Sequence, residues 1–341
     1  MAAKFASLPD EVKKVTETPH AYFQVGWSHG NEKLQGDKPD WAKGSYYCNP
    51  LVDRPTEDEA LIKQYPSFLE PNVWPTCSIP EFEGAFKSLG RQVVEVGRML
   101  AYHCDAFVEG ECEGYEKGAF YKLLCESKCC KGRLLHYFPS DEVAEMNSKA
   151  DGEAVAVGGE ATSPGGTVVP SPVKKEDEDT AFSNSCGWHN DHGSLTGLVP
   201  AMYLDKAGVV VPNPDPASGL YVRSRSGKLV QVKFPVNSNC VAFQIGETSQ
   251  IHTGGVLQAT PHAVRGAEGA GAVGISRDTF AVFMEPEYDG ALELPAGKSV
   301  ADVQSGEAVR WLPKTVKTLG SRWVEGMDFG EFSEKTFEAF Y

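Results

Sequence analysis

The sequence predicts a mainly β protein, a sandwich or barrel of short strands with helices packed outside it. Short runs of alternating apolar and polar residues, separated by turn residues, fill the C-terminal half of the chain. A long helical stripe precedes these runs, and a shorter helical pattern closes the chain. The 341 residues are enough for a sizeable buried core, and we interpret them as a single domain.

Composition and charge narrow the functional classes. Hydrophobic residues make up 41% of the chain, and the formal net charge is −15. A surface this acidic repels phosphate backbones, so a nucleic-acid partner is not expected. No apolar run reaches the length of a membrane span, and the segment MAAKFASLPDEVKK lacks the apolar stretch of a secretory signal. We therefore expect a cytoplasmic monomer that acts on a small molecule.

The N-terminal section, residues 1–118, is expected to combine irregular structure with one long helix. Residues 1–75 are rich in Pro, Gly and aromatic residues and lack clear periodicity. A helix is predicted over 79–107, with Ser78 as its cap and Pro80 in its first turn. Apolar residues then recur at steps of four and three, which predicts one buried face. These residues are Phe82, Phe86, Leu89, Val93, Val96, Leu100 and Cys104.

Residues 119–139 and 147–185 contrast in composition. The first segment predicts a helical piece and then a short strand, RLLHYFP. The second is rich in Gly, Pro, Ala and charge and has no aromatic residue before Phe182. It cannot bury enough apolar surface to offset the entropy of ordering, so we predict a disordered acidic insertion. A regulatory or partner-binding role for this insertion stays open.

Residues 186–290 carry the predicted strands. GLYVRSRSGKLVQVKF predicts a hairpin that turns at Ser-Gly. Val241, Phe243 and Ile245 alternate with their neighbours, so one face of that strand should be buried. GVLQATPHAV and ISRDTFAVFMEP predict two more strands. The last section, 291–341, is expected to end in a helix over FGEFSEKTFEAFY.

The segment GWHNDHG, residues 187–193, holds a candidate metal site. In an extended chain the side chains at i and i+2 point the same way, so His189 and Asp191 would share a face. A third ligand should come from a neighbouring strand, where His252 and His262 are the candidates. His252 precedes a turn, whereas His262 lies within a predicted strand, which favours His262.

A second pair with i, i+2 spacing, Arg277 and Thr279, follows on the next predicted strand. The guanidinium can bind both oxygens of a carboxylate, and the hydroxyl can add a third hydrogen bond. Two histidines and one carboxylate leave positions open on a six-coordinate metal, as in non-haem Fe(II) oxygenases. A catalytic zinc site could use similar ligands, but a zinc hydrolase has no particular need for the carboxylate clamp.

These residues carry a family resemblance. HNDHGSLTGL, IGETSQIHTGGVLQATPHAV, RDTFAVFMEP and the NVWP segment before the long helix resemble motifs of the isopenicillin N synthase-like Fe(II)/2-oxoglutarate-dependent dioxygenases. The resemblance implies a double-stranded β-helix, or jelly roll. It implies Fe(II) held by His189, Asp191 and His262, with 2-oxoglutarate on Arg277 and Thr279. It implies O2 as co-substrate, succinate as a product, and hydroxylation, desaturation or ring closure of a small organic molecule.

The sequence departs from the family pattern at one motif. His136-Tyr137-Phe138-Pro139 stands where the family often has Asn-Tyr-Tyr-Pro, so the tyrosine that commonly lies near the co-substrate is replaced by Phe138. His136 could substitute for the asparagine. The 15-residue step from His262 to Arg277 is also longer than usual.

Two other functions stay open. One is an Fe(II) oxidase of the same fold that does not use 2-oxoglutarate, and the other is a non-catalytic scaffold that binds partners through the acidic insertion. Among the other polar groups, His192 is expected at the surface or behind the ligands, and His252 and the GWSHG segment (26–30) in turns. The nine cysteines, including Cys125, Cys129 and Cys130, are expected to be free thiols.

Overall fold

The computed structural model describes residues 1–32, 39–155, 182, 186–235, 239–305, 312–313 and 316–340. Within these residues two antiparallel sheets form the core, as the sequence predicted. The larger sheet has the order β1-β2-β3-β12-β5-β10, with β6 paired to β12 and β7 to β6. The smaller sheet has the order β4-β11-β8-β9. The strands of the larger sheet are β1 (Gly26–His29), β2 (Lys43–Cys48), β3 (Lys131–Tyr137), β5 (Leu195–Leu198), β6 (Met202–Leu204), β7 (Val210–Val211), β10 (Ala242–Ile245) and β12 (Ser276–Met284). Those of the smaller sheet are β4 (Cys186–His189), β8 (Gly219–Arg223), β9 (Leu229–Gln231) and β11 (His262–Arg265).

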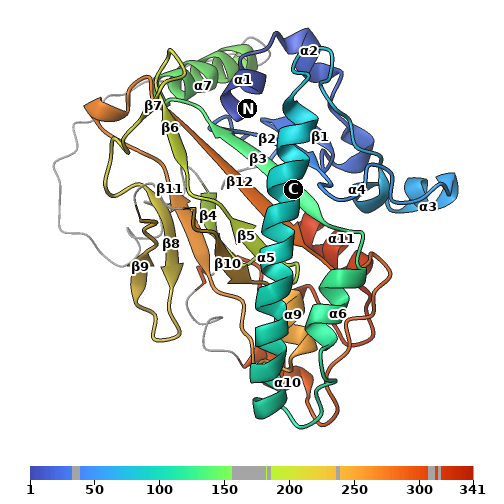
Figure 1. The fold of residues 1–341 in the computed structure, drawn as a ribbon. Helices are drawn as coiled ribbons and strands as arrows, with labels where there is room; N and C mark the ends of the chain where they lie inside the picture. The colour runs from blue at the N-terminus through green and yellow to red at the C-terminus, as the bar shows by residue number, and fades with distance from the viewer. Residues whose placement is uncertain are drawn as a thin grey trace.

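The two sheets pack face to face, with β12 running through the middle of the larger one (Figure 1). Val264 of the smaller sheet packs in one cluster with side chains of β3, β5 and β12. This double-layer arrangement with helices outside is the jelly roll implied by the sequence resemblance. The strands predicted from the C-terminal half are present but shorter than predicted, and of GVLQATPHAV only residues 262–264 belong to β11. The predicted hairpin is confirmed as β8–β9, with Gly227 at φ 78° in its turn.

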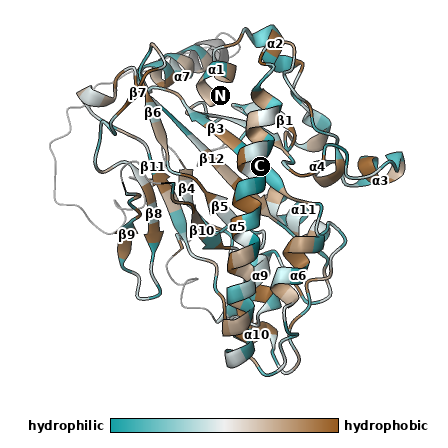
Figure 2. Ribbon diagram, in the orientation of Figure 1, coloured by the Kyte–Doolittle hydropathy of each residue, from teal (hydrophilic) through white to brown (hydrophobic). Residues whose placement is uncertain are grey.

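Helix α5 (Phe82–Glu111) crosses the outer face of the larger sheet (Figure 1). It begins after Glu81, so the expected start at 79 and the Ser78 cap are wrong; the Ser78 and Ile79 N–H groups instead bond to the Pro75 carbonyl in the preceding turn. Hydrophobic and polar residues alternate around the helix (Figure 2).

Part of the predicted buried stripe of α5 is also wrong. Phe82, Phe86 and Val93 are buried, but Leu89 and Val96 are 38% and 39% exposed. Glycines take their place on the buried face. A Cβ on Gly90 would lie 2.3 Å from Pro50, and one on Gly97 would lie 2.4 Å from Met284 of β12. The helix therefore approaches the sheet through residues that a hydrophobic pattern does not count.

The acidic insertion begins later than expected. Helix α7 (Ser140–Val155) includes residues 147–155 of the segment predicted to be disordered. Its Ala, Glu, Met and Lys residues favour helix, and Asp141 and Glu142 in the first turn suit the helix dipole. Most of the remaining insertion lies outside the described residues. Phe182 is described: it is buried and packs against Trp188 and Tyr221.

The N-terminal section is more regular than its composition suggested. GWSHG is not a turn, because residues 26–29 form β1 and pair in register with β2. Trp27 and Tyr46 are partners in this ladder and face the core under α5. The helices around these strands are α1 (Ala2–Ala6), α2 (Asp10–Lys14), α3 (Glu59–Gln64), α4 (Pro66–Leu69) and α6 (Ala119–Glu126), with the 3-10 turn η1 (Pro19–Ala21).

The C-terminal section packs beneath the sheets as a second hydrophobic cluster, in which Trp323, Phe329 and Phe332 are fully buried. The predicted terminal helix is confirmed as α11 (Phe329–Phe340). Among the described residues no helix is long and apolar enough to cross a membrane. The other short elements are α9 (Glu247–His252), η2 (Ala270–Ala272), α10 (Val300–Gln304) and η4 (Leu319–Ser321).

Candidate metal centre

Strand pairing in the smaller sheet brings the two predicted histidine ligands together. His189, the last residue of β4, is the register partner of His262, the first residue of β11. Asp191 follows in the loop that leads to β5, and its carbonyl accepts the Glu247 N–H at 2.8 Å. Gly246 allows this close approach, since a Cβ there would lie 2.0 Å from the Gly193 carbonyl oxygen. The loop is therefore held at both ends.

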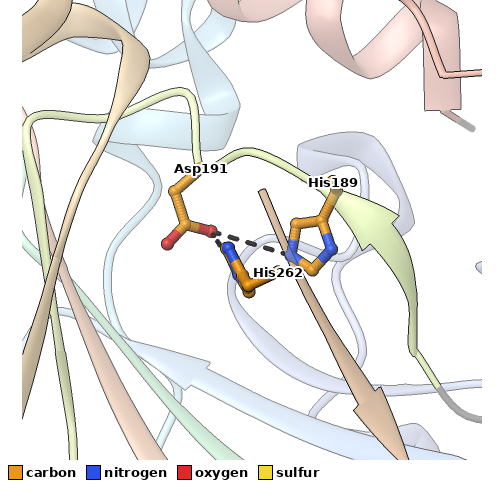
Figure 3. Close-up of side chains that lie close together, drawn as sticks. All are labelled: His189, Asp191 and His262. Carbon is orange, nitrogen blue, oxygen red and sulfur yellow. Dashed lines mark ion pairs between the residues drawn. The ribbon is translucent and has the colours of Figure 1, made fainter. Parts of the chain in front are cut away.

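His189, Asp191 and His262 form a compact group of ligand atoms (Figure 3). The Nε2 atoms of His189 and His262 lie 3.8 Å and 3.7 Å from the same oxygen, Oδ1 of Asp191. The two imidazole rings are 4.1 Å apart between centroids. One ligand atom from each residue can be chosen so that all three lie within 4.8 Å of one another, a spacing that could hold a metal ion.

Backbone hydrogen bonds fix which imidazole nitrogens face this space. Nδ1 of His189 lies 2.8 Å from the Gly187 carbonyl, and Nδ1 of His262 lies 3.0 Å from the Thr260 carbonyl. A carbonyl can only accept, so each Nδ1 carries a proton, and each Nε2 holds the lone pair when its ring is neutral. This is the orientation that metal-binding histidines usually have.

The pKa shifts of Asp191 and His262 favour the protonation states that metal ligands need, an ionised carboxylate and a neutral imidazole. Burial would raise the pKa of Asp191, but the neighbouring His262 and His189 lower it, so the carboxyl is ionised. Burial and the neighbouring His189 lower the pKa of His262 to about 4, which keeps this ring neutral at pH 7. For His189 burial is outweighed by the charge of Cys186, which raises the pKa, so a metal would displace a proton there. Oδ2 of Asp191 is buried and has no hydrogen-bond partner among the described residues.

Arg277 is the most unusual polar residue of the facing sheet. It shares the inner face of β12 with Thr279 and with Ala281, which packs between the sheets. In the described part of the chain, its Nε and Nη1 are buried without a hydrogen-bond partner, and no carboxylate pairs with it. Its guanidinium lies 4.9 Å from the centre of the Tyr137 ring. The hydroxyl of Thr279 donates to the Val199 carbonyl at 3.2 Å.

The structure corrects the expectation for the HYFP motif. Tyr137, not Phe138, is the register partner of Arg277 and faces between the sheets. Phe138 lies beyond the end of β3 and stacks on His29 at 4.7 Å. His136 points to the opposite face, where its Nδ1 lies 2.7 Å from Asp278, so it cannot replace the family's asparagine beside a co-substrate. Alternate residues of a strand lie on the same face, so Leu135 on the inner face of β3 also places Tyr137 there.

Several inward-facing polar residues were missed from the sequence. Gln244 of β10 is 8% exposed, and neither amide atom has a hydrogen-bond partner in the described residues. Thr196, its register partner on β5, lowers the pKa of Asp191 through a side-chain hydrogen bond. Glu285, just after β12, is 4% exposed, and burial raises its pKa to about 7. Steps of two residues from Thr279 lead to Glu285, so the alternation of the strand would have placed both on the same face.

The other histidines and cysteines have structural surroundings. His192 packs on Phe329 with ring centroids 5.6 Å apart, so it lies behind the ligands, and His252 ends α9 with Nε2 3.1 Å from the Ala291 carbonyl. The expectation of free thiols is confirmed for all nine cysteines. Cys129 and Cys130 are buried in two different hydrophobic clusters, and Cys125 is exposed.

Comparisons with known proteins place the fold. No family model matches the chain, and no curated protein matches it in sequence. Solved structures do match. A Caulobacter crescentus protein assigned to the 2OG-Fe(II) oxygenase family aligns with TM-score 0.59 and 19% identity, covering 98% of this chain and 81% of that one. A full-length Neurospora crassa protein, solved in complex with alpha-KG and thymine, aligns with TM-score 0.55 and 20% identity over 98% of this chain and 81% of that one.

A third match is JOX2, in complex with 2OG, Fe and JA, with TM-score 0.53 and 14% identity over 99% of this chain and 75% of that one. At these identities the likeness defines the fold. The protein has the jelly-roll fold of 2OG-Fe(II) oxygenase structures, and it carries a His-Asp-His group that could hold a metal on one of its two sheets.

Proposed function

We propose that this protein is a non-haem Fe(II)- and 2-oxoglutarate-dependent dioxygenase that oxidises a small organic molecule. One observation carries the proposal. A His-Asp-His group with both Nε2 atoms turned to Asp191 lies in the same sheet sandwich as Arg277, whose Nε and Nη1 are buried and which has no acidic partner in the described residues. A metal site explains the first feature, and an anionic co-substrate explains the second.

The donor set fits Fe(II). Two imidazole nitrogens and one carboxylate oxygen form the 2-His-1-carboxylate set of non-haem Fe(II) oxygenases and leave coordination positions free. His189, Asp191 and His262 would hold the ion, and the unpartnered Oδ2 of Asp191 leaves that carboxylate free to adjust. Bound iron would supply the activation of O2 that no side chain of this protein can provide.

The inner face of β12 fits 2-oxoglutarate. Arg277 would bind the co-substrate carboxylate remote from the iron through two parallel hydrogen bonds. The ring of Tyr137 lies against the guanidinium and limits where it can swing, and its phenol can add a hydrogen bond to the co-substrate. Leu135, Leu198 and Val264 line the space between the sheets and exclude water, which strengthens these charged contacts.

The proposed substrate is a small organic molecule, acted on in the cytoplasm by a monomer. The Neurospora crassa protein holds thymine in its complex and JOX2 holds JA, both small, and the charge of −15 disfavours a nucleic-acid substrate. The oxidase alternative rested on Phe138 at the tyrosine position, and the placement of Tyr137 beside Arg277 favours the use of 2-oxoglutarate instead. Whether the outcome is hydroxylation, desaturation or ring closure depends on the substrate itself.

An anaerobic titration tests the proposal. Fe(II) is added to the full-length protein, then 2-oxoglutarate, while the visible spectrum is recorded. We expect a metal-to-ligand charge-transfer band only when both are present, and succinate formation on exposure to air. Tight iron binding without the band would instead indicate the oxidase. Failure to bind iron would reject the proposal and leave the scaffold function.

A further inference from the structure

Glu285 lies against the loop that carries Asp191. β12 ends at Met284, and strand alternation places the next residue on the same side as Phe283 and Ala281. A Cβ on Gly193 would lie 3.1 Å from Cγ of Glu285 and 3.8 Å from its Oε1. The glutamate chain therefore rests on Gly193, two residues beyond Asp191. A larger residue at 193 would press on the Glu285 side chain.

Glu285 also lacks the partners that buried acids need. An ionised carboxylate costs several kcal/mol when buried unless it is paired or hydrogen-bonded. Glu285 is 4% exposed, its Oε2 is fully buried, and neither oxygen accepts a hydrogen bond from any described residue. Lys131, the cation that acts on it electrostatically, donates instead to the Ser67 carbonyl at 2.7 Å and lies 5.5 Å from the centre of the Phe68 ring.

A comparison with the other buried acids shows that the absence of a partner at Glu285 is unusual. Six Asp and Glu residues are buried in the described part of the chain. Four have partners close at hand: Asp40 has Lys43, Asp105 has Tyr115 and two backbone N–H groups, Glu247 has Arg322, and Asp278 has His136 and the Ala3 N–H. The other two, Asp191 and Glu285, each keep a buried oxygen that neither a hydrogen-bond donor nor a cation of the described residues satisfies. For Asp191 the proposed metal explains the unsatisfied oxygen, and the neighbouring Glu285 needs an explanation of the same kind.

We propose that Glu285 is a substrate-recognition residue that accepts hydrogen bonds from N–H groups of the substrate beside the metal. The inference rests on the proposed function and names a substrate class: a small nitrogen-containing molecule with a ring N–H or ammonium at this end. A carboxylate in the same place would face both Glu285 and Asp191 and would be repelled. The two ends of the inner face of β12 thus differ in role, with Arg277 for an anion and Glu285 for a donor.

The test compares probes that differ only in N–H donors. Full-length protein is loaded with Zn(II), as a redox-inert metal, and with 2-oxoglutarate. Thymine and other small N–H heterocycles, their N-methylated counterparts, such as 1,3-dimethylthymine, and benzoate are then examined by ligand-observed saturation-transfer NMR. We expect at least one N–H heterocycle to bind while its N-methylated counterpart and benzoate bind at least about tenfold more weakly, the value of a hydrogen bond to a charged group.

Variants assign the discrimination to Glu285. Glu285→Gln keeps the shape of the side chain but removes its charge, so binding of the N–H heterocycle should weaken by about tenfold. Glu287→Gln is the matched control, because Glu287 already accepts the Lys128 N–H at 2.6 Å. Retained circular dichroism should show that both variants fold. The inference fails if no N–H heterocycle binds, if methylation makes no difference, or if Glu285→Gln binds as wild type does.

The iron spectrum separates this inference from the proposed function. The charge-transfer band with Fe(II) and 2-oxoglutarate should be the same in wild type and Glu285→Gln, because Glu285 touches neither ligand in the proposed arrangement. A wild-type protein without the band would overturn the function and the inference with it. A normal band together with equal binding of N–H and N-methyl probes would overturn the inference alone.

Discussion

The two faces of β12 handle polar residues in opposite ways. On the outer face, Phe280, Val282 and Met284 pack into the core beneath α5, and the one charged residue, Asp278, is bonded to His136 and to the Ala3 N–H. On the inner face Arg277 has two buried N–H-bearing nitrogens without a partner in the described residues. The charged group of the outer face is satisfied within the protein, and that of the inner face is not.

The difference matches the proposed roles, in which residues of the outer face hold the fold and residues of the inner face bind a ligand. A buried polar group without a partner destabilises the protein, so it persists only where another role maintains it. The outer face should therefore control the free energy of unfolding, while the inner face and the facing triad should control ligand binding. Variants on each face test whether stability and ligand binding are controlled separately.

The largest expected effect is the loss of iron binding in His262→Ala. This change removes one of three proposed ligands, and two ligands leave the ion too weakly held. Equilibrium dialysis with Fe(II) should find no stoichiometric binding at concentrations that saturate the wild type. His252→Ala is the matched control, because the ring of His252 bonds to the Ala291 carbonyl at the end of α9, away from the triad. An unchanged iron affinity in His262→Ala would remove this residue from the site.

On the outer face, Phe280→Ala should lower the free energy of unfolding by about 4 kcal/mol, since it empties a buried aromatic site. Phe280 is 3% exposed, and its ring meets that of Phe86 edge to face at 4.9 Å. Urea denaturation measures the loss. The folded variant should still show the iron and 2-oxoglutarate absorption band. A folded variant that binds no 2-oxoglutarate would mean that the two faces are not independent.

On the inner face, Arg277→Ala should weaken 2-oxoglutarate binding by about 100-fold, or about 2.7 kcal/mol, through loss of a bidentate charged contact. Iron affinity should hardly change, because Arg277 belongs to the other sheet. Calorimetric titration of the Zn(II)-loaded protein with 2-oxoglutarate gives the first value, and iron dialysis gives the second. Equal 2-oxoglutarate affinity in variant and wild type would count against the carboxylate clamp.

The same contrast explains how much the sequence could predict. The candidate ligands His189 and Asp191 could be paired from the sequence because i, i+2 spacing survives in any extended segment, and His262 was proposed because it lies in a predicted strand. Arg277 and Thr279 were paired by the same spacing. The predicted strands and the double-layer fold agree with the structure because apolar alternation determines which face of each strand is buried.

What failed depended on distant contacts. Tyr137 was missed because the motif was counted back from Pro139, whereas Tyr137 is the last residue of β3 and the register partner of Arg277. Leu89 was assigned to the core because it continues the apolar steps of four and three. Gly90 and Gly97, which let α5 approach the sheet, carry no hydrophobic signal. Glu285 has no hydrogen-bond donor among the described residues because Lys131 donates to the Ser67 carbonyl instead, and no local sequence pattern predicts that contact.

Glu285 predicts a pH dependence of stability in the metal-free protein. Its pKa is raised from 4.5 to about 7 in the folded state, so its contribution is full below pH 4.5 and is lost as pH rises through 7. Between about pH 5 and pH 7.5 the free energy of unfolding should fall by about 2 kcal/mol more in wild type than in Glu285→Gln, at about 1.4 kcal/mol per pKa unit. Urea titrations of both proteins across this range make the comparison. Parallel pH profiles would show that Glu285 is already partnered.

The smallest effect is expected for Thr279→Val, which tests whether the Thr279 hydroxyl contributes to 2-oxoglutarate affinity. The Thr279 hydroxyl already donates to the Val199 carbonyl, so it can bond to a co-substrate carboxylate only by turning its proton away from that carbonyl. One hydrogen bond is thus exchanged for another, and the net loss on removing the hydroxyl should stay below about 1 kcal/mol, or a few-fold in the 2-oxoglutarate dissociation constant. The same calorimetric titration measures it. A loss as large as that of Arg277→Ala would mean that the threonine releases Val199 when the co-substrate binds, and that the two residues act as one unit on the inner face.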